Sequence, residues 1–346
     1  MSDFVRRLPV YLLLDCSESV AGEPFEAIKA GLYSLISTLQ QDPMALETAA
    51  LSVIGFSGKA TELIPLTDLT QVSMPRLRLG SGTALGSALS ILQASIERNV
   101  RKNSATTKGD YKPNIFLLTD GRPTDSWMAE ADKVRAKVGS NQYNMIAVGC
   151  GDDADLEALS RITPIVIRSK DLNPEVMAQF FQWVSASVTT VSTAVSGAGN
   201  GEIHLPNVPD LLEVVPGNEQ PVTHQSDRFV FLHLHCVKTR QFYLMRFERR
   251  PQSESDYRNP PQYDCVAVHP VEDFDFESSV KSSATVSSAQ LHSLKACPYC
   301  NNPGYGMCLK GHTHCSPGKT ATLTCPVCSE TNLYEVRDFG VGSGAG

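Results

Sequence analysis

The sequence predicts an α/β protein with a doubly wound, mostly parallel sheet, followed by a β-rich segment and a small cysteine-rich module. Three observations predict this organisation. From residue 8 to about residue 190, apolar runs typical of strands alternate with runs whose apolar residues recur at helical spacing. Two later runs, 229–237 and 242–247, are strand-like and are joined by a short polar turn. Six of the ten cysteines then lie between residues 297 and 328.

The first elements are a buried strand and an amphipathic helix. The run Leu8–Leu14 is continuously apolar and ends at Asp15, which is typical of a strand buried on both faces. A helix is predicted to begin near Pro24, because proline suits a first helical turn and apolar residues follow at helical spacing. Those residues are Phe25, Ile28, Leu32, Leu35, Ile36 and Leu39. The next strand is predicted over Leu51–Phe56, and Leu63–Ile64 continues the sheet after a turn.

The rest of this region repeats the alternation of helix and strand. A second helix is indicated by Leu85, Leu89, Leu92 and Ile96. The later strands are predicted over Ile115–Leu118, Met145–Val148 and Ile165–Ile167, and the last helix over Pro174–Val188. Repeated strand and helix units of this kind form a doubly wound sheet, which binds ligands at the carboxyl ends of its strands.

The length and the changes in composition predict the domain boundaries. The chain has 346 residues, of which 42% are hydrophobic, enough for about two domains with buried cores and a further small module. Ser196–Gly201 has the composition of a flexible linker, and Ser278–Ser293 is rich in serine. A third late strand is predicted over 263–268. We expect an α/β domain over 1–195, a β-rich segment over 203–277, a metal-binding module over 294–335 and a flexible tail over 336–346.

The charge balance and hydropathy exclude several classes of protein. The chain has 30 Lys and Arg against 37 Asp and Glu, a net charge of −7, so binding to nucleic acid through phosphate contacts is not expected. No apolar run is long enough to cross a bilayer, and Leu8–Leu14 is too short for a signal peptide. We therefore expect a cytoplasmic protein that binds neither membranes nor nucleic acid directly.

Three predicted loops carry hydroxyl and carboxylate side chains. Asp15, Ser17 and Ser19 follow the first strand in the pattern DxSxS, and residues two apart in an extended loop point to the same side. Thr83 lies in a Gly-rich loop before a helix, and Asp120 follows a buried strand. Such oxygen ligands suit Mg²⁺ or Mn²⁺. Each motif alone is more often a helix cap or a turn, but together and in this order they indicate a metal site.

These motifs resemble the von Willebrand factor A domain and its metal-ion-dependent adhesion site, over about residues 8 to 190. The resemblance implies that Ser17, Ser19 and Thr83 contact the ion through hydroxyls, and that Asp15 and Asp120 act directly or through water. It also implies that an acidic residue of a bound partner often supplies the sixth ligand. The run from Thr119 to Asp125 is similar to that of bacterial intracellular members. We expect Asp125 to cap the helix that follows it rather than to bind metal.

The C-terminal cysteines predict zinc binding. The pairs Cys297-Pro-Tyr-Cys300 and Cys325-Pro-Val-Cys328 are CxxC turns, each of which presents two thiolates to one ion. Between them lie Cys308, His312, His314 and Cys315. Four free buried cysteines are a poor alternative, because this segment is too short and polar to form a core, whereas zinc supplies folding free energy. The other cysteines, Cys16, Cys150, Cys236 and Cys265, are interpreted as reduced and mostly buried thiols.

The pairing of the zinc ligands has two solutions. In a zinc ribbon, one ion takes Cys297, Cys300, Cys325 and Cys328, and a second ion takes Cys308, His312, His314 and Cys315. In a RING-like cross-brace, Cys308-x₃-His312-x₂-Cys315 forms the middle, but that pattern requires a further cysteine near Gly318 that is missing here. His314 is equally well interpreted as a bystander. We assign no role to His233 and His235, which alternate along one predicted strand.

An A-type domain followed by a zinc module is similar to the TerY-type proteins of bacterial tellurium-resistance and stress systems. The resemblance implies a metal-dependent interaction scaffold that works with a protein kinase and a Ser/Thr phosphatase, and that is not itself an enzyme. The alternatives are a Mg²⁺- or Mn²⁺-dependent hydrolase or phosphatase, a RING-like ubiquitin ligase, and a transcription or repair scaffold. Against the hydrolase, the motifs contain no evident general base or nucleophile beside the ion.

Overall fold

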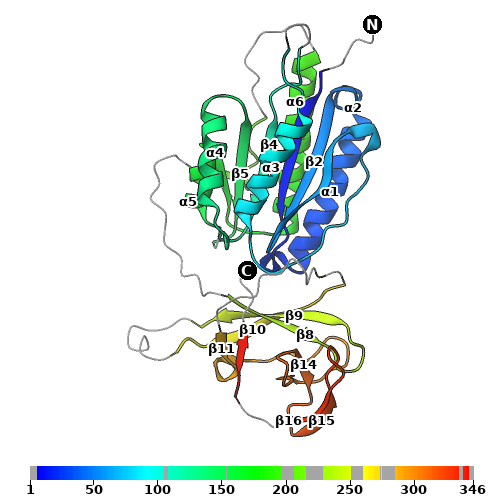
Figure 1. The fold of residues 1–346 in the computed structure, drawn as a ribbon, viewed down its shortest axis with the longest axis vertical. Helices are drawn as coiled ribbons and strands as arrows, with labels where there is room; N and C mark the ends of the chain where they lie inside the picture. The colour runs from blue at the N-terminus through cyan, green and yellow to red at the C-terminus, as the bar shows by residue number, and fades with distance from the viewer. Residues whose placement is uncertain are drawn as a thin grey trace. The chain divides into compact units, whose positions relative to one another are not determined.

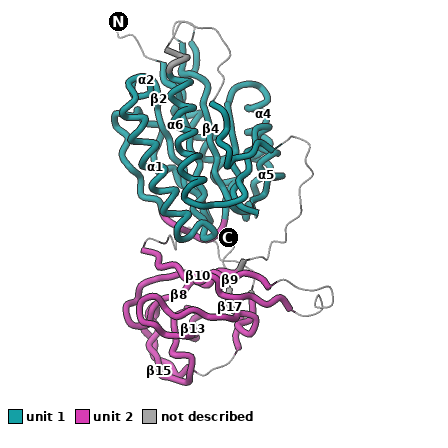
Figure 2. The backbone as a smooth tube through the Cα atoms, turned by 180° about the vertical axis from the view of Figure 1, so that it is seen from behind, with its two compact units in different colours: residues 1–77, 83–224 teal, residues 78–82, 225–346 magenta. Residues whose placement is uncertain are grey.

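The chain folds into two compact units in a computed structural model. The structure describes residues 6–104, 108–152, 154–196, 206–215, 229–250, 260–272, 274, 285–334 and 338–342. The first unit comprises Met1–Leu77 and Thr83–His224, and the second comprises Arg78–Gly82 and Gln225–Gly346 (Figure 2). Each unit has its own sheets and is described by itself.

The first unit is built on a seven-stranded sheet of order β3-β2-β1-β4-β5-β6-β7 (Figure 1). Its strands are β1 (Leu8–Asp15), β2 (Ala49–Phe56), β3 (Ala60–Asp68), β4 (Asn114–Thr119), β5 (Asn144–Cys150), β6 (Val166–Ser169) and β7 (Glu213–Val214). The five central strands of this order, β2, β1, β4, β5 and β6, run parallel, and β3 and β7 are antiparallel at the two edges. All eight residues of β1 are buried, as its continuous apolar sequence predicts.

Helices cover both faces of this sheet, which confirms the predicted doubly wound α/β class (Figure 1, Figure 2). On one face lie α1 (Glu23–Gln41), α2 (Pro43–Thr48) and α6 (Pro174–Ser196), and on the other lie α3 (Leu85–Asn99), α4 (Met128–Gly139) and α5 (Leu156–Ile162). Two single-turn helices, η1 (Glu18–Val20) and η2 (Leu69–Gln71), lie in the loops. A Cβ on Gly31 of α1 would lie 2.1 Å from Cδ2 of Phe181, so α1 and α6 pack closely only because residue 31 is glycine.

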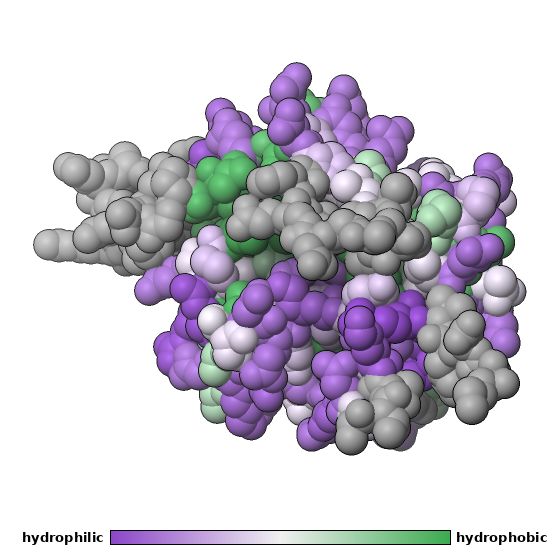
Figure 3. All heavy atoms as spheres, turned by 90° about the horizontal axis from the view of Figure 1, so that it is seen from above, coloured by the Kyte–Doolittle hydropathy of each residue, from purple (hydrophilic) through white to green (hydrophobic). Residues whose placement is uncertain are grey.

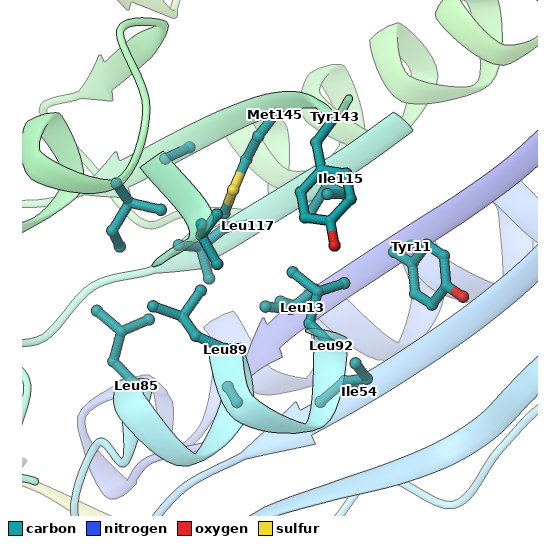
Figure 4. Close-up of a cluster of buried hydrophobic side chains, with 14 of the residues drawn as sticks. Tyr11, Leu13, Ile54, Leu85, Leu89, Leu92, Ile115, Leu117, Tyr143 and Met145 are labelled. Atoms are coloured by element: carbon teal, nitrogen blue, oxygen red, sulfur yellow. The ribbon is translucent and has the colours of Figure 1, made fainter. Parts of the chain in front are cut away.

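The helical spacing read in the sequence places one face of α3 on the sheet. Leu85, Leu89 and Leu92 are buried and point toward side chains of the parallel strands, including Leu13 and Ile115 (Figure 4). Burial of a leucine side chain contributes about 1.5–3 kcal/mol to stability. This packing fixes α3, and hence the loop that precedes it, against the centre of the sheet.

The second unit contains a six-stranded sheet of order β12-β10-β9-β8-β14-β13. Its strands are β8 (Phe229–His235), β9 (Phe242–Arg249), β10 (Tyr263–Pro270), β12 (Leu291–His292), β13 (Gly304–Met307) and β14 (Thr313–Ser316). A single-turn helix, η4 (Ser288–Gln290), precedes β12, and β15 (Ala321–Thr324) pairs with β16 (Thr331–Tyr334).

The predicted boundary between the β-rich segment and the cysteine module is wrong in this structure. Strand β14 of the module pairs with β8 of the β-rich segment at His314 and His235, so the two parts share one sheet. The predicted flexible tail also contributes a strand, because β17 (Gly340–Gly342) pairs with β11 (Thr285–Ser287). The predicted linker lies outside the described residues except for Ser196, which ends α6.

Within the described part of the chain, no helix combines the length and the apolar composition needed to cross a bilayer. The described side chains visible from above are mainly hydrophilic, and the hydrophobic ones gather in small areas (Figure 3).

Candidate metal centres

The predicted oxygen ligands meet at the carboxyl edge of the first sheet. Asp15 ends β1, Asp120 directly follows β4, and the two strands are parallel neighbours. The chain winds outward in opposite directions from this pair of strands, since β2 lies beyond β1 and β5 lies beyond β4. Such a switch point is where open α/β sheets bind ligands.

A continuous chain of hydrogen bonds links β1 to the loop after β4. The backbone N–H of Ser17 donates to Oδ1 of Asp15 at 2.9 Å, and the hydroxyls of Ser17 and Ser19 lie 2.8 Å apart. The Ser19 hydroxyl donates to Oδ1 of Asp120 at 2.8 Å. Thr119 donates its hydroxyl to the other carboxylate oxygen of Asp15. The structure therefore brings together four of the five predicted ligands by direct or one-step contacts.

The fifth predicted ligand, Thr83, is buried with an unsatisfied hydroxyl. Its side chain is 1% exposed, and Oγ1 has no hydrogen-bond partner among the described residues. Leaving a buried hydroxyl unpaired costs about 1–3 kcal/mol, so such a group in a folded protein needs an explanation. A cation held by the five predicted side chains would supply one. We call Asp15, Ser17, Ser19, Thr83 and Asp120 the oxygen site.

The electrostatics of the oxygen site also fit a cation. Burial raises the pKa of Asp15, although hydrogen bonds from Thr119 and Ser17 act in the opposite direction. A buried carboxylate is stabilised by an adjacent positive charge. The five side chains offer only hydroxyl and carboxylate oxygens, which are the ligands of hard divalent cations such as Mg²⁺ and Mn²⁺.

Asp125 does not cap the helix that follows it, contrary to the prediction. Its Oδ1 accepts the backbone N–H of Gly86 at 2.9 Å, and its Oδ2 accepts that of Ser87 at 2.8 Å. Asp125 therefore caps α3, which begins directly after the Thr83 loop. Helix α4 is preceded by Trp127 and has no side-chain cap. The sequence could not show this, because the start of α3 approaches Asp125 only in the folded chain.

The cysteines of the second unit form two clusters whose membership differs from the predicted zinc-ribbon pairing. The first cysteine cluster brings together four thiols whose sulfur atoms all lie within 4.8 Å of one another. Its members are Cys236, Cys297, Cys300 and Cys315. The Sγ atoms of Cys300 and Cys315 are 3.5 Å apart. A tetrahedral zinc ion with Zn–S bonds of about 2.3 Å places its sulfur ligands about 3.8 Å apart, so the cluster has the dimensions of a four-cysteine site.

The second cysteine cluster combines three thiols and one imidazole, again within 4.8 Å of one another. Its members are Cys308, His312, Cys325 and Cys328. Sγ of Cys308 lies 3.4 Å from Nδ1 of His312 and 3.9 Å from Sγ of Cys328, and Sγ of Cys325 lies 4.0 Å from the same imidazole nitrogen. These separations fit a tetrahedral site with three sulfur ligands and one nitrogen ligand.

The two clusters interleave along the chain, as the cross-brace alternative requires. The CxxC pair at Cys297 shares a cluster with Cys315, and the pair at Cys325 shares a cluster with Cys308 and His312. The position that the cross-brace pattern lacks near Gly318 is taken by Cys236, from the β8–β9 turn. The ribbon pairing is not formed because β14 pairs with β8, and Cys315 and Cys236 thereby join Cys297 and Cys300 in place of the second CxxC pair.

Cys236 is a candidate ligand that the sequence analysis missed, and its turn has the geometry of the CxxC turns. Its N–H donates to the carbonyl of Gln241, its carbonyl accepts the N–H of Arg240, and Arg240 has φ 64°. The turns after Cys297 and Cys325 repeat these two backbone bonds, with left-handed Asn301 and Ser329 in the place of Arg240. Burial raises the pKa of Cys236, but hydrogen bonds from Thr239 and the neighbouring backbone lower it to about 7.

Three histidines predicted to be doubtful or inert ligands lie outside both clusters. His314 is fully buried, and its Nδ1 lies 3.0 Å from the carbonyl oxygen of Cys315 while its Nε2 lies 2.9 Å from the Tyr334 hydroxyl. His233 and His235 contact the ring of Phe242, and burial is the main cause that lowers the pKa of His235 to about 4.

Family comparisons match the same two parts of the chain. Residues 10–179 match the family model of the von Willebrand factor type A domain, and residues 226–346 match that of the TerY-C metal binding domain. The first match lies within the predicted α/β domain, whereas the second runs from the predicted β-rich segment through the predicted metal-binding module to residue 346.

The curated relatives share the first of these parts. The chain is 27% identical over 169 residues to the uncharacterized protein sll0103 of Synechocystis sp., a match that covers 46% of this chain and 36% of the relative. It is 28% identical over 162 residues to matrilin-3 of Gallus gallus, covering 44% and 33%. The chain thus spans about a third of the length of these relatives.

Two solved structures match parts of the chain at low sequence identity. A von Willebrand factor type A protein from Catenulispora acidiphila has a TM-score of 0.41 and 13% identity, with 80% of this chain and 68% of that chain covered. Proximal thread matrix protein 1 from the mussel byssus, in a structure with a zinc-occupied MIDAS motif, has a TM-score of 0.38 and 17% identity, with 53% and 48% covered.

Proposed function

Because the chain carries a von Willebrand factor type A domain and a TerY-C metal binding domain, we propose that it is a metal-dependent protein-interaction scaffold. In this proposal the oxygen site holds Mg²⁺ or Mn²⁺, and the bound ion attracts an acidic side chain of a partner protein. The observation that carries the proposal is the buried hydroxyl of Thr83, which has no partner among the described residues and whose loop is hydrogen-bonded through Thr124 to the loop of Asp120.

The number of protein ligands supports a role in binding an acidic group. Ser17, Ser19 and Thr83 are neutral, so only Asp15 and Asp120 offset the two charges of a divalent ion. Asp15 is buried and accepts hydrogen bonds from the Thr119 hydroxyl and the Ser17 backbone N–H, while Asp120 accepts one from the Ser19 hydroxyl. These two carboxylates balance the ion's charge formally, but five side chains leave open the sixth position that Mg²⁺ prefers, and a carboxylate of a partner can fill it.

Structural zinc is the proposed role of the two cysteine clusters. Each cluster supplies four ligands, which completes a tetrahedral site and leaves no open position for catalysis. The first cysteine cluster lies in the hydrophobic core of its unit, since Cys236, Cys297 and Cys315 pack with residues of β8 and β9. Zinc there would tie the β8–β9 turn to the C-terminal module.

The site residues support a scaffold rather than an enzyme. Two thiols are close enough to the oxygen site to be affected by its carboxylates. Cys16 follows Asp15 in the sequence, and the negative charge of Asp120 acts on Cys150. Burial raises the pKa of both, which keeps them protonated and poorly nucleophilic. In the TerY-type assignment, the partners are a protein kinase and a Ser/Thr phosphatase of a cytoplasmic tellurium-resistance or stress response.

Affinity capture from a bacterial lysate tests the proposal. The full chain should retain a kinase or phosphatase in Mg²⁺ and lose it in EDTA. Because EDTA also removes zinc, Ser19→Ala and Asp120→Ala separate the oxygen site from the cysteine clusters, and both should lose the partner. Asp132→Ala, an exposed carboxylate on α4 paired with Arg161, is the matched control and should retain it. Capture that survives both EDTA and Asp120→Ala would refute the scaffold site.

A further inference from the structure

Two loops of the oxygen site are joined by hydrogen bonds between the backbone of Thr83 and both the side chain and the backbone of Thr124. The N–H of Thr83 donates to Oγ1 of Thr124 at 2.9 Å, and the N–H of Thr124 donates to the carbonyl of Thr83 at 2.9 Å. Thr83 is thereby held through both its N–H and its carbonyl by one residue. That residue belongs to the loop after β4, which also carries Asp120.

The next residue extends the same connection to helix α3. Both carboxylate oxygens of Asp125 accept backbone N–H groups from the first turn of α3, those of Gly86 and Ser87. A carboxylate at this place satisfies two donors that a helix leaves free and faces the positive end of the helix dipole. The carbonyl of Asp125 in turn accepts the N–H of Trp127 at 3.0 Å, which closes the loop on itself.

The approach of the two segments is close enough to require glycine. A Cβ on Gly86 would lie 2.7 Å from Cα of Trp127 and 2.8 Å from the carbonyl oxygen of Ser126. Backbone atoms cannot yield to that overlap as a flexible side chain could. The contact therefore fixes the Thr83 loop and the Asp120 loop as one unit.

We propose that Thr124 and Asp125 are positioning residues that hold the Thr83 hydroxyl ready to bind the ion and thereby set the metal affinity of the oxygen site. This inference rests on the proposed function of that site. Without the two residues, the Thr83 loop must be ordered when the ion binds, and the conformational entropy of that ordering is subtracted from the affinity. With them, Thr83 and Asp120 keep a fixed separation whether or not the ion is present.

Mn²⁺ binding to the full chain, followed by electron paramagnetic resonance and by calorimetry, tests this role. Thr124→Val keeps the shape of the side chain and removes the acceptor for the Thr83 N–H, and Asp125→Ala removes both acceptors for α3. Each change should weaken Mn²⁺ binding at least tenfold. Thr124→Ser restores the hydroxyl and should bind Mn²⁺ as the wild type does.

A second capped helix separates positioning from stability. Asp42 caps α2 through the N–H groups of Met44 and Ala45, both at 2.9 Å, away from the oxygen ligands. Asp42→Ala should lower the melting temperature as Asp125→Ala does, yet leave Mn²⁺ affinity unchanged. Equal losses of affinity in the two variants, or normal affinity in Thr124→Val, would overturn the inference. A wild-type chain that binds no Mn²⁺ would refute the proposed function itself.

Discussion

His312 directly precedes β14 and Cys315 lies within it, three positions further on, yet their side chains belong to different cysteine clusters. One short segment therefore contributes to both clusters, and between the two residues His314 joins the carbonyl of Cys315 to the hydroxyl of Tyr334. Displacement of β14 disturbs both clusters at once.

Replacing Cys236 tests the membership of the first cysteine cluster. Cys236→Ser should lower the zinc content of the purified chain from two ions to one, because three remaining thiols do not complete a tetrahedral site. Elemental analysis of protein purified without chelator measures this. The first unit should stay folded, since it shares no ligand with the cluster.

Cys265→Ser is the matched control for Cys236→Ser. Cys265 is a buried thiol of the same hydrophobic core and belongs to neither cluster. It should keep both ions. Equal zinc content in the wild type and Cys236→Ser would show that Cys236 is a packing residue, as the sequence alone had indicated.

Tyr243→Phe should speed the loss of metal from the first cysteine cluster. The Tyr243 hydroxyl is buried and has no hydrogen-bond partner of normal geometry in the described chain. Burial is the main cause that raises its pKa, and the nearby thiols of Cys297 and Cys315 add to it. A hydroxyl beside metal-bound thiolates can donate to them, and loss of such support typically weakens metal binding 10- to 100-fold. The rate of metal loss is measured as the metal passes to a chelator that changes colour on binding it.

Tyr299 provides the comparison for Tyr243. Its hydroxyl donates to the carbonyl of Phe242 at 3.0 Å. Tyr299→Phe should therefore release metal at the wild-type rate. If both variants or neither variant releases metal faster, the Tyr243 hydroxyl has no particular role at the cluster.

Much of the fold follows from local sequence, and the part that does not depends on contacts between distant segments. The continuous apolar run of β1 and the DxSxS motif both lie within single short segments, so their structure is predictable. Cys236 lies far from the other cysteines along the chain and has no CxxC partner, so nothing local distinguishes it from a buried thiol. Its place in the first cysteine cluster, and the turn geometry that it shares with Cys297 and Cys325, mark it as a candidate ligand. For Asp125, the sequence predicts a cap but cannot tell which helix it caps.

The ion pair of Arg7 and Asp110 stabilises the fold at neutral pH, and this contribution should be lost in acid. Asp110 accepts hydrogen bonds from the side chain and N–H of Arg7 and from the N–H of Arg101, and its side chain is 1% exposed. Burial acts to raise the pKa of Asp110, but these bonds outweigh it, and the pKa is lowered. Its stabilising contribution is therefore complete above the unfolded pKa of about 3.9 and is lost as pH falls through the lower folded value.

Asp110→Asn should lower the free energy of unfolding at pH 7 by about 3 kcal/mol, since it leaves a partly buried guanidinium with only the longer, 3.8 Å pair to the exposed Asp68. Thermal melts between pH 2 and pH 7 measure the effect, and the gap to the wild type should narrow below about pH 3.5. Asp132→Asn, which breaks the exposed pair with Arg161, should change little at any pH. Parallel pH profiles for the wild type and Asp110→Asn would contradict the prediction.

Thr83→Val should have opposite effects on stability with and without metal. In EDTA, the change removes a buried hydroxyl that has no partner in the described structure, so the free energy of unfolding should rise by about 1 kcal/mol. With Mg²⁺ at 100 times its dissociation constant, the wild type should gain about 2.7 kcal/mol from binding, and Thr83→Val should gain far less because one ligand is missing. Urea denaturation of both proteins in Mg²⁺ and in EDTA gives the four values.

Cys236→Ser, measured alongside, shows how much of the EDTA effect comes from zinc in the second unit. If Thr83→Val is less stable than the wild type in EDTA, the hydroxyl has a partner in the folded chain, and the main argument for a cation at the oxygen site is lost.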